Sequence, residues 1–180
     1  MKDMKYYLKV TLSLLLICTV VAGLLAAVNL LTVDIIAANA QKERERAVSA
    51  IFSDMTWMRD TEKEYLDGVN TVYAVYAGEM WIGYAVDLNS RGFGGDINMI
   101  VGIGEDGTLR GVRVVSHAET PGLGSRATLV EYLDNFVGVG ESLTVKEDVD
   151  AISGATVSSK AVVAGVNLAL SLGLGGAENG

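Results

Sequence analysis

The feature that most constrains this chain is an uninterrupted apolar stretch near its start, residues 10–31, which runs for 22 residues without a charge or a proline. As an α-helix it would be roughly 33 Å long, enough to cross a hydrocarbon core of about 30 Å. The alternative is a buried helix in a soluble core, but such a helix rarely lies at a chain end behind cationic residues. We therefore predict a membrane anchor.

The charges that flank the apolar stretch predict its orientation. Lys2, Lys5 and Lys9 precede it, and Asp34 is the first charge after it. Positive residues stay on the cytoplasmic side, so we expect a cytoplasmic N-terminus and an extracytoplasmic remainder, in the periplasm or at the cell exterior. A cleaved signal peptide is the alternative, with a small-residue site at residues 38–40. Its apolar region would run for only about 7–15 residues, which favours a retained, single-pass anchor.

The composition of the part beyond the anchor argues against several classes of function. Beyond the anchor, 11 basic residues face 21 acidic ones, so nucleic acid is a poor partner for this surface. Cys18 is the only cysteine and His117 the only histidine. An internal disulfide is therefore excluded, and we predict that the chain assembles no iron–sulfur cluster, zinc site or other metal centre by itself.

Residue patterns beyond the anchor predict an α+β domain. Residues 34–55 have helical periodicity. One hairpin is predicted for residues 71–77 and 80–88, which are rich in β-branched and aromatic residues and flank a Gly-Glu pair. A second hairpin is predicted for residues 97–103 and 109–115, which flank a Gly-Glu-Asp-Gly turn. Residues 126–136 and 157–172 have helical composition. We expect a transmembrane helix followed by a single extracytoplasmic domain with an antiparallel sheet and packed helices.

These patterns divide the chain into three parts. Residues 1–33 are the cytoplasmic N-terminus and anchor, residues 34–67 a juxtamembrane helix and linker, and residues 68–180 a ligand-binding domain. The juxtamembrane helix is interpreted as a solvated stalk, because it contains a mixed-charge run at residues 41–46.

Three glycine-containing segments are candidates for ligand binding. In residues 150–156 (DAISGAT), Ser153 or Thr156 can cap the following helix, and unpaired N–H groups at a helix start favour a phosphate. Residues 117–124 (HAETPGLG) combine three hydrogen-bonding side chains with a proline and two glycines, and residues 92–96 (GFGGD) precede a predicted strand. Each segment alone also fits a purely structural turn.

Together the three segments resemble the FMN-binding domain of the G subunit of Rnf complexes, which also occurs in the C subunit of the sodium-translocating NADH:quinone reductase. The resemblance covers about residues 68–172, and its most specific part is the pattern Asp-x-x-Ser-Gly-Ala-Thr at residues 150–156. It implies that a flavin transferase moves FMN from FAD onto the Thr156 hydroxyl as a phosphoester. Ser158 and Ser159 are the next hydroxyls to consider.

The resemblance implies a set of cofactor-binding residues and no catalytic residue. Glu119 and Thr120 are expected to contact the isoalloxazine ring or ribityl chain, Ser153 to steady the turn and Asp150 to be read by the transferase, while His117 either touches the flavin or packs locally. The full set is Thr156, Ser153, Gly154, Ala155, His117, Glu119, Thr120, Gly122, Leu123 and Gly124.

The function that the resemblance implies is electron transfer. The chain would be the covalent-FMN subunit of a membrane complex that couples ferredoxin and NAD redox chemistry to sodium or proton transport, with other membrane subunits as partners. Three alternatives stay open: the C subunit of the quinone reductase, a stand-alone anchored flavoprotein that reduces extracellular acceptors, and a non-redox module for another phosphate-bearing ligand.

Overall fold

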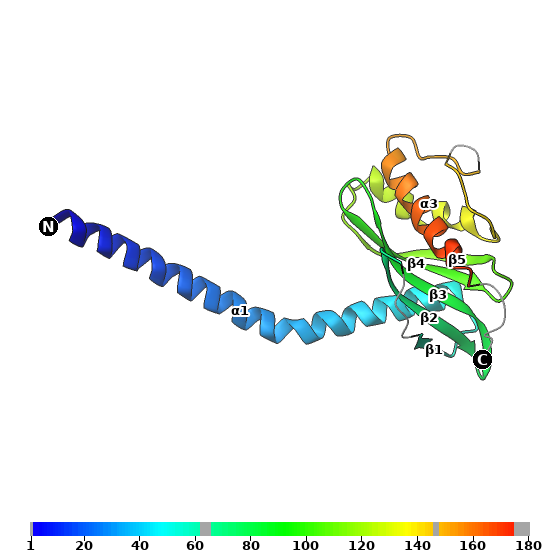
Figure 1. Cartoon of the computed structure of the whole chain (residues 1–180), viewed down its shortest axis with the longest axis horizontal. Helices are drawn as coiled ribbons and strands as arrows, with labels where there is room; N and C mark the ends of the chain where they lie inside the picture. The colour runs from blue at the N-terminus through cyan, green and yellow to red at the C-terminus, as the bar shows by residue number, and fades with distance from the viewer. Residues whose placement is uncertain (1, 62–65, 146–147, 175–180) are drawn as a thin grey trace. The chain divides into compact units, whose positions relative to one another are not determined.

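The computed structural model describes residues 2–61, 66–145 and 148–174, and the chain forms two compact units, Met1–Lys42 and Glu43–Gly180. Helix α1 (Lys2–Ile51) supplies the first unit and the beginning of the second (Figure 1).

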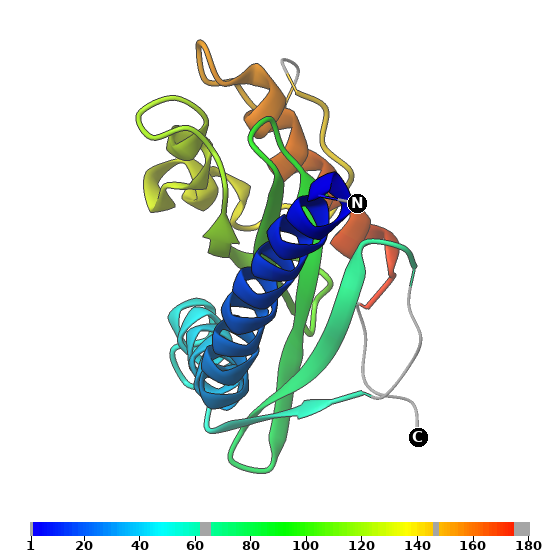
Figure 2. The ribbon, with the colours of Figure 1, turned by 90° about the vertical axis from the view of Figure 1, so that its left-hand side faces the viewer.

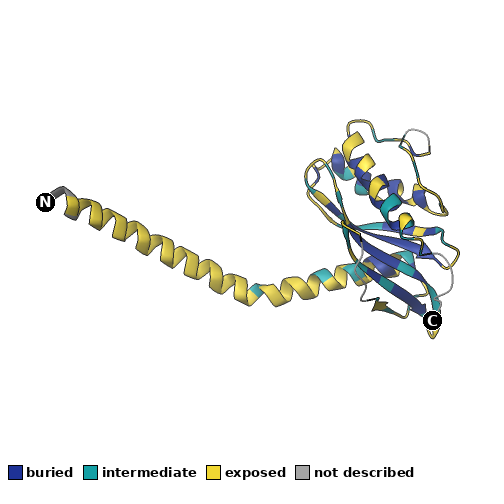
Figure 3. Cartoon of the chain, in the orientation of Figure 1, coloured by how far each residue is buried: buried dark blue, intermediate teal, exposed yellow. Residues whose placement is uncertain are grey.

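The first unit is a helix whose apolar side chains are covered by nothing in the described chain. The large apolar residues from Met4 to Ile36 are exposed, and none of the most apolar window is buried (Figure 3). The hydroxyls of Thr11, Ser13 and Thr19 donate to the backbone carbonyls four residues earlier, which satisfies them within the helix. By length and composition this helix suits a membrane span.

The second unit is built on a five-stranded antiparallel sheet with the strand order β1-β2-β3-β4-β5. Its strands are β1 (Trp57–Asp60), β2 (Val69–Ala77), β3 (Met80–Arg91), β4 (Asp96–Gly104) and β5 (Leu109–His117). Both predicted hairpins are confirmed, and Gly78 and Gly107 adopt the positive φ that their turns require. The short edge strand β1 has no alternating pattern and was not predicted.

Helices cover both faces of this sheet (Figures 1 and 2). Helix α3 (Thr156–Ser171) packs on one face together with the short helices η1 (Gly124–Thr128), α2 (Val130–Leu133) and η2 (Asp134–Phe136). The core on this side includes Leu88, Met99, Val101, Phe136 and Val166, all fully buried. The α+β fold with an N-terminal apolar helix is thus confirmed.

The last turns of α1 cover the opposite face, where Val48 and Phe52 are buried against Val75 and Ile100. The prediction of a solvated stalk is therefore wrong for Ala47 and Val48, because the apolar stripe after the mixed-charge run is part of the domain core. Gly102 permits this contact: a Cβ atom there would lie 2.4 Å from Cγ2 of Ile51.

A polar cluster around Asp87 lies within the same layer. The Asp87 carboxylate, 1% exposed, accepts a hydrogen bond from Nε of Arg44 at 2.6 Å and others from the side-chain amides of Asn70 and Asn98 at 2.9 and 2.7 Å. A carboxylate buried this deeply needs such partners to remain charged. The ion pair therefore ties α1 to the middle of strand β3.

The predicted helix at residues 126–136 is replaced by three short pieces. Leu129 adopts an extended conformation between η1 and α2 and is 52% exposed, while Leu133 and Phe136 are buried. Burying Leu133 and Phe136 against the sheet outweighs the helical propensity of the segment, which is a weak determinant by itself. The predicted helix at residues 157–172 is confirmed as α3.

Candidate functional site

The site is built around the start of helix α3. Its N-cap is Ala155, preceded by Gly154 at φ +79°, and no side chain of the described residues caps the helix. The prediction that Ser153 or Thr156 caps α3 is therefore wrong. Instead, the Ala155 N–H donates to the carbonyl of Ile152 at 2.9 Å, and the Ile152 N–H donates to Oγ of Ser159 at 3.1 Å. These bonds hold the turn and leave the first N–H groups of the helix without a side-chain cap.

The hydroxyl groups on the first turn of α3 differ sharply in accessibility. Thr156 is exposed, whereas Ser158 and Ser159 are 1% and 0% exposed and both are hydrogen-bonded within the fold. Of the three, only the Thr156 side chain is open to a large reagent.

Thr156 lies at a cavity of about 280 Å³ formed by all three glycine-containing segments. The lining residues are Phe93, Glu119, Thr120, Leu123, Gly124, Gly154, Ala155, Thr156, Val157 and Ser158. Seven of the ten cofactor-binding residues predicted from the sequence are therefore brought together. Among the described residues, His117, Gly122 and Ser153 lie outside this lining set.

The apolar side chains at this cavity are unusually open to solvent. Phe93, Leu123 and Val157 are 76%, 54% and 50% exposed. Ligand sites typically combine such apolar walls with a few placed polar groups, so this cavity suits a flat aromatic ring. The sequence analysis did not predict Phe93 and Val157 as site residues. The position of Phe93 within the glycine-rich segment 92–96 could have indicated its role.

Local hydrogen bonds shape the backbone of the loop at residues 117–124. Nδ1 of His117 accepts the Glu119 N–H at 3.2 Å, the Thr120 carbonyl accepts the Leu123 N–H at 3.1 Å, and the Gly122 N–H donates to Oγ of Ser125 at 2.9 Å. His117 thus makes a local contact. A contact between His117 and a ligand stays a prediction.

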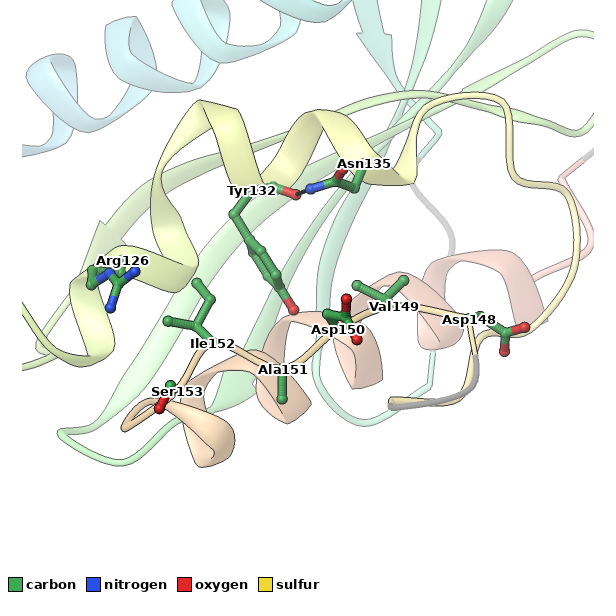
Figure 4. Close-up of a pocket in the computed structure, with 9 residues that line it drawn as sticks. All are labelled: Arg126, Tyr132, Asn135, Asp148, Val149, Asp150, Ala151, Ile152 and Ser153. Atoms are coloured by element: carbon green, nitrogen blue, oxygen red, sulfur yellow. Dashed lines mark hydrogen bonds between the residues drawn. The ribbon is translucent and has the colours of Figure 1, made fainter.

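A second cavity, of about 490 Å³, borders the segment that precedes α3 (Figure 4). Its lining residues are Arg126, Tyr132, Asn135, Asp148, Val149, Asp150, Ala151, Ile152 and Ser153. Polar groups dominate this lining, which suits a flat apolar ring less well than the cavity at Thr156 does. The smaller cavity is therefore the better candidate for a ligand site, and Ser153 and Asp150 line the larger one.

The environment of Tyr132, which lines this second cavity, predicts that the stability of the fold depends on pH. Burial raises the pKa of the Tyr132 hydroxyl above its ordinary value of 10.0, and Asp150 raises it further, while Ser159 opposes the change. The folded state therefore binds this proton more tightly than the unfolded state does. The resulting stabilisation is complete below about pH 10 and is lost as the pH rises towards the folded pKa.

We accordingly expect Tyr132→Phe to reduce the loss of stability above pH 10. Urea unfolding of the full chain in detergent at pH 8 and pH 11 measures this. The wild type should lose more unfolding free energy between these two values than the variant does. Equal losses would contradict the assignment, and Tyr7→Phe, in the first unit, serves as the control.

Comparison with known proteins identifies the domain and its setting. Residues 92–171 match the model of the FMN-binding domain, and residues 1–51 match that of the RnfG N-terminal region. The G subunit of an ion-translocating oxidoreductase complex from Methanosarcina acetivorans is 35% identical over 91% of this chain and 92% of its own length. The G subunits of the proton-translocating ferredoxin:NAD(+) oxidoreductase complex of Clostridium ljungdahlii and of the Na(+)-translocating complex of Acetobacterium woodii are each 31% identical, again over 92% of their length.

The fold and the site thus define a flavin-domain protein with an apolar N-terminal helix. The chain belongs to the family of G subunits of ion-translocating Rnf oxidoreductase complexes.

Proposed function

We propose that this chain is the FMN-carrying electron-transfer subunit of an ion-translocating ferredoxin:NAD oxidoreductase complex, with the FMN esterified to Thr156. The observation that carries the proposal is the exposed Thr156 at the uncapped start of α3, beside an apolar cavity within the matched FMN-binding domain. FMN supplies redox chemistry and can pass electrons singly, while the protein binds it and tunes it.

The residues of the cavity fit the parts of FMN. The first N–H groups of α3 offer donors and a positive dipole end to the phosphate that an ester on Thr156 would carry. Phe93, Leu123 and Val157 offer apolar surface to the ring, and Thr120 offers a hydroxyl. Gly154 at positive φ lets the turn reach Thr156 without a side chain in the way. Contacts of Glu119, Gly124 and Ala155 with the flavin complete the proposed set.

Attachment on Thr156 needs a flavin transferase, which would use FAD as the donor. The covalent bond has a physical purpose if the domain lies outside the cytoplasm, because a dissociated cofactor could not be replaced there from a cytoplasmic pool. Other membrane subunits of the complex are the proposed electron donor and acceptor. The relatives are named as G subunits of ion-translocating complexes, which favours this assignment over the quinone reductase subunit and over a stand-alone flavoprotein.

The test of this function is purification of the full chain from cells that contain a flavin transferase. We expect flavin fluorescence to stay with the polypeptide on a denaturing gel, and the intact mass to exceed that of the sequence by one FMN moiety. Co-purification with the other membrane subunits should follow. Flavin that separates on denaturation would contradict the covalent bond, and a protein that never acquires flavin would contradict the function.

The proposed topology gives an independent prediction. The basic residues Lys2, Lys5 and Lys9 should keep the N-terminus in the cytoplasm, so a reporter fused after residue 180 should report an extracytoplasmic position. Mass analysis should find the intact N-terminus. A new N-terminus at Gln41 would mean that the apolar helix is a cleaved signal, and a cytoplasmic reporter would reverse the orientation.

A further inference from the structure

Glu119 is a buried carboxylate that an ester on Thr156 does not explain. It is 4% exposed, and no Lys or Arg in the described part of the chain forms an ion pair with it. Burying a carboxylate costs free energy unless it is well hydrogen-bonded. Other interactions must therefore compensate for burying the Glu119 carboxylate.

The carboxylate joins segments that are far apart in the sequence. Oε1 accepts the N–H groups of Phe93 at 2.7 Å and Gly94 at 3.2 Å, in the turn between β3 and β4. Oε2 accepts the hydroxyl of Ser158 at 2.7 Å, in the first turn of α3. Phe93, Glu119 and Ser158 all line the cavity at Thr156, so one side chain connects three of its walls.

Two glycines leave room for this carboxylate. A Cβ atom added to Gly92 would lie 2.1 Å from Oε1, and one added to Gly124 would lie 1.9 Å from Oε2. Gly124 is buried and its added Cβ would also lie 2.7 Å from Oγ of Ser158. The glycine-rich segments thus pack around Glu119, in addition to bordering the cavity.

We propose that Glu119 is a positioning residue that assembles the flavin cavity, holding the Phe93 turn and the first turn of α3 in place before the flavin is attached. All three of its partners are donors, so the side chain serves as a charged acceptor. Its fixed negative charge in the cavity wall also opposes the arrival of an electron, which keeps the flavin potential low. This second part rests on the proposed binding of FMN in this cavity.

Glu119→Gln separates the effect of the negative charge of Glu119 from the effect of its hydrogen bonds to Phe93, Gly94 and Ser158. The amide oxygen can accept the Phe93 and Gly94 N–H groups, and its NH₂ group can donate to Ser158, whose hydroxyl rotates to accept. This variant should keep the cavity and lose the charge. Glu119→Ala loses both, and Ser158→Ala loses one hydrogen bond while the charge remains.

Amide hydrogen exchange in the full chain, made without a flavin transferase, tests the connection. Exchange at Phe93 and Gly94 should be slow in the wild type, similar in Glu119→Gln, and at least about tenfold faster in Glu119→Ala, because local opening sets the rate. Wild-type exchange in a folded Glu119→Ala would overturn the proposal. If that variant does not fold, Ser158→Ala decides: faster exchange at Ser159, whose N–H donates to the Ala155 carbonyl at 2.9 Å, supports the connection, and unchanged exchange there overturns it.

Redox titration of the flavin-loaded protein tests the charge. Glu119→Gln should favour one-electron reduction roughly fivefold, which is about 40 mV upward at about 59 mV per tenfold change. Glu131→Gln, which removes an equal charge from the exposed surface of α2, should leave the potential unchanged. An unchanged potential in Glu119→Gln would overturn the electrostatic part. If the wild type acquires no flavin, the proposed function fails, while the exchange measurement still decides the role of Glu119.

Discussion

Thr156→Ala is expected to abolish covalent flavin attachment and to leave a folded, membrane-inserted protein. Thr156 is exposed and is the first residue of α3, so its side chain contributes little to the core. The substitution removes the hydroxyl oxygen that we propose forms the ester. The measurement is intact mass together with flavin fluorescence on a denaturing gel, and the loss should be complete.

Two variants make this result specific. Thr156→Ser keeps a hydroxyl at the same position and should retain some covalent flavin, whereas Ser171→Ala, at the other end of α3, should load as the wild type does. Ser158 and Ser159 are poor replacements for Thr156, because both are buried and hydrogen-bonded. Covalent FMN in Thr156→Ala would show that the site assignment is wrong, and the exposed Ser153 would then be examined first.

Arg44→Met is expected to cause the largest loss of stability among the surface-accessible cations of the domain. It would leave the carboxylate of Asp87, 1% exposed, without its charged partner, 2.6 Å away. Removing one member of a buried ion pair costs about 3–5 kcal/mol. Because the Arg44 side chain is 30% exposed and two asparagine amides remain, we expect about 2–4 kcal/mol.

Chemical denaturation of the full chain in detergent, followed by tryptophan fluorescence, measures this loss. The matched control is Arg46→Met, two residues along the same helix, where the pair with Glu43 is exposed and should contribute less than about 1 kcal/mol. Adding Asp87→Asn to Arg44→Met should restore part of the stability, because no buried charge is then left unpaired. Equal losses in the two arginine variants would contradict the buried ion pair as a main support.

The elements that the sequence predicted well are those that local patterns determine. The apolar stretch at residues 10–31, the hairpin turns at Gly78 and Gly107, and the helix after Thr156 each follow from neighbouring residues. A hairpin turn needs a positive φ within a few residues, and a membrane span needs an apolar run, so neither depends on distant contacts.

The elements that were wrong or missed depend on contacts between distant segments. Ala47 and Val48 directly follow a charged run, yet they are buried against the sheet. The predicted helix around Leu129 is interrupted because Leu133 and Phe136 pack against the sheet. Strand β1 exists only through its pairing with β2. Intrinsic propensity is a weak guide wherever burial of a few side chains decides the conformation.

The site divides in the same way. The sequence alone supplied the three glycine-containing segments and, through the family resemblance, the prediction that Thr156 carries the flavin, because these rest on short stretches of residues. Only the tertiary structure showed that Ser158 and Ser159 are inaccessible, that Phe93 borders the cavity, and that Glu119 bonds to Phe93, 26 residues before it, and to Ser158, 39 residues after it. The hydrogen-bond donors of a buried carboxylate can come from any segment that the fold places next to it, so they cannot be identified before the sheet has brought the three segments together.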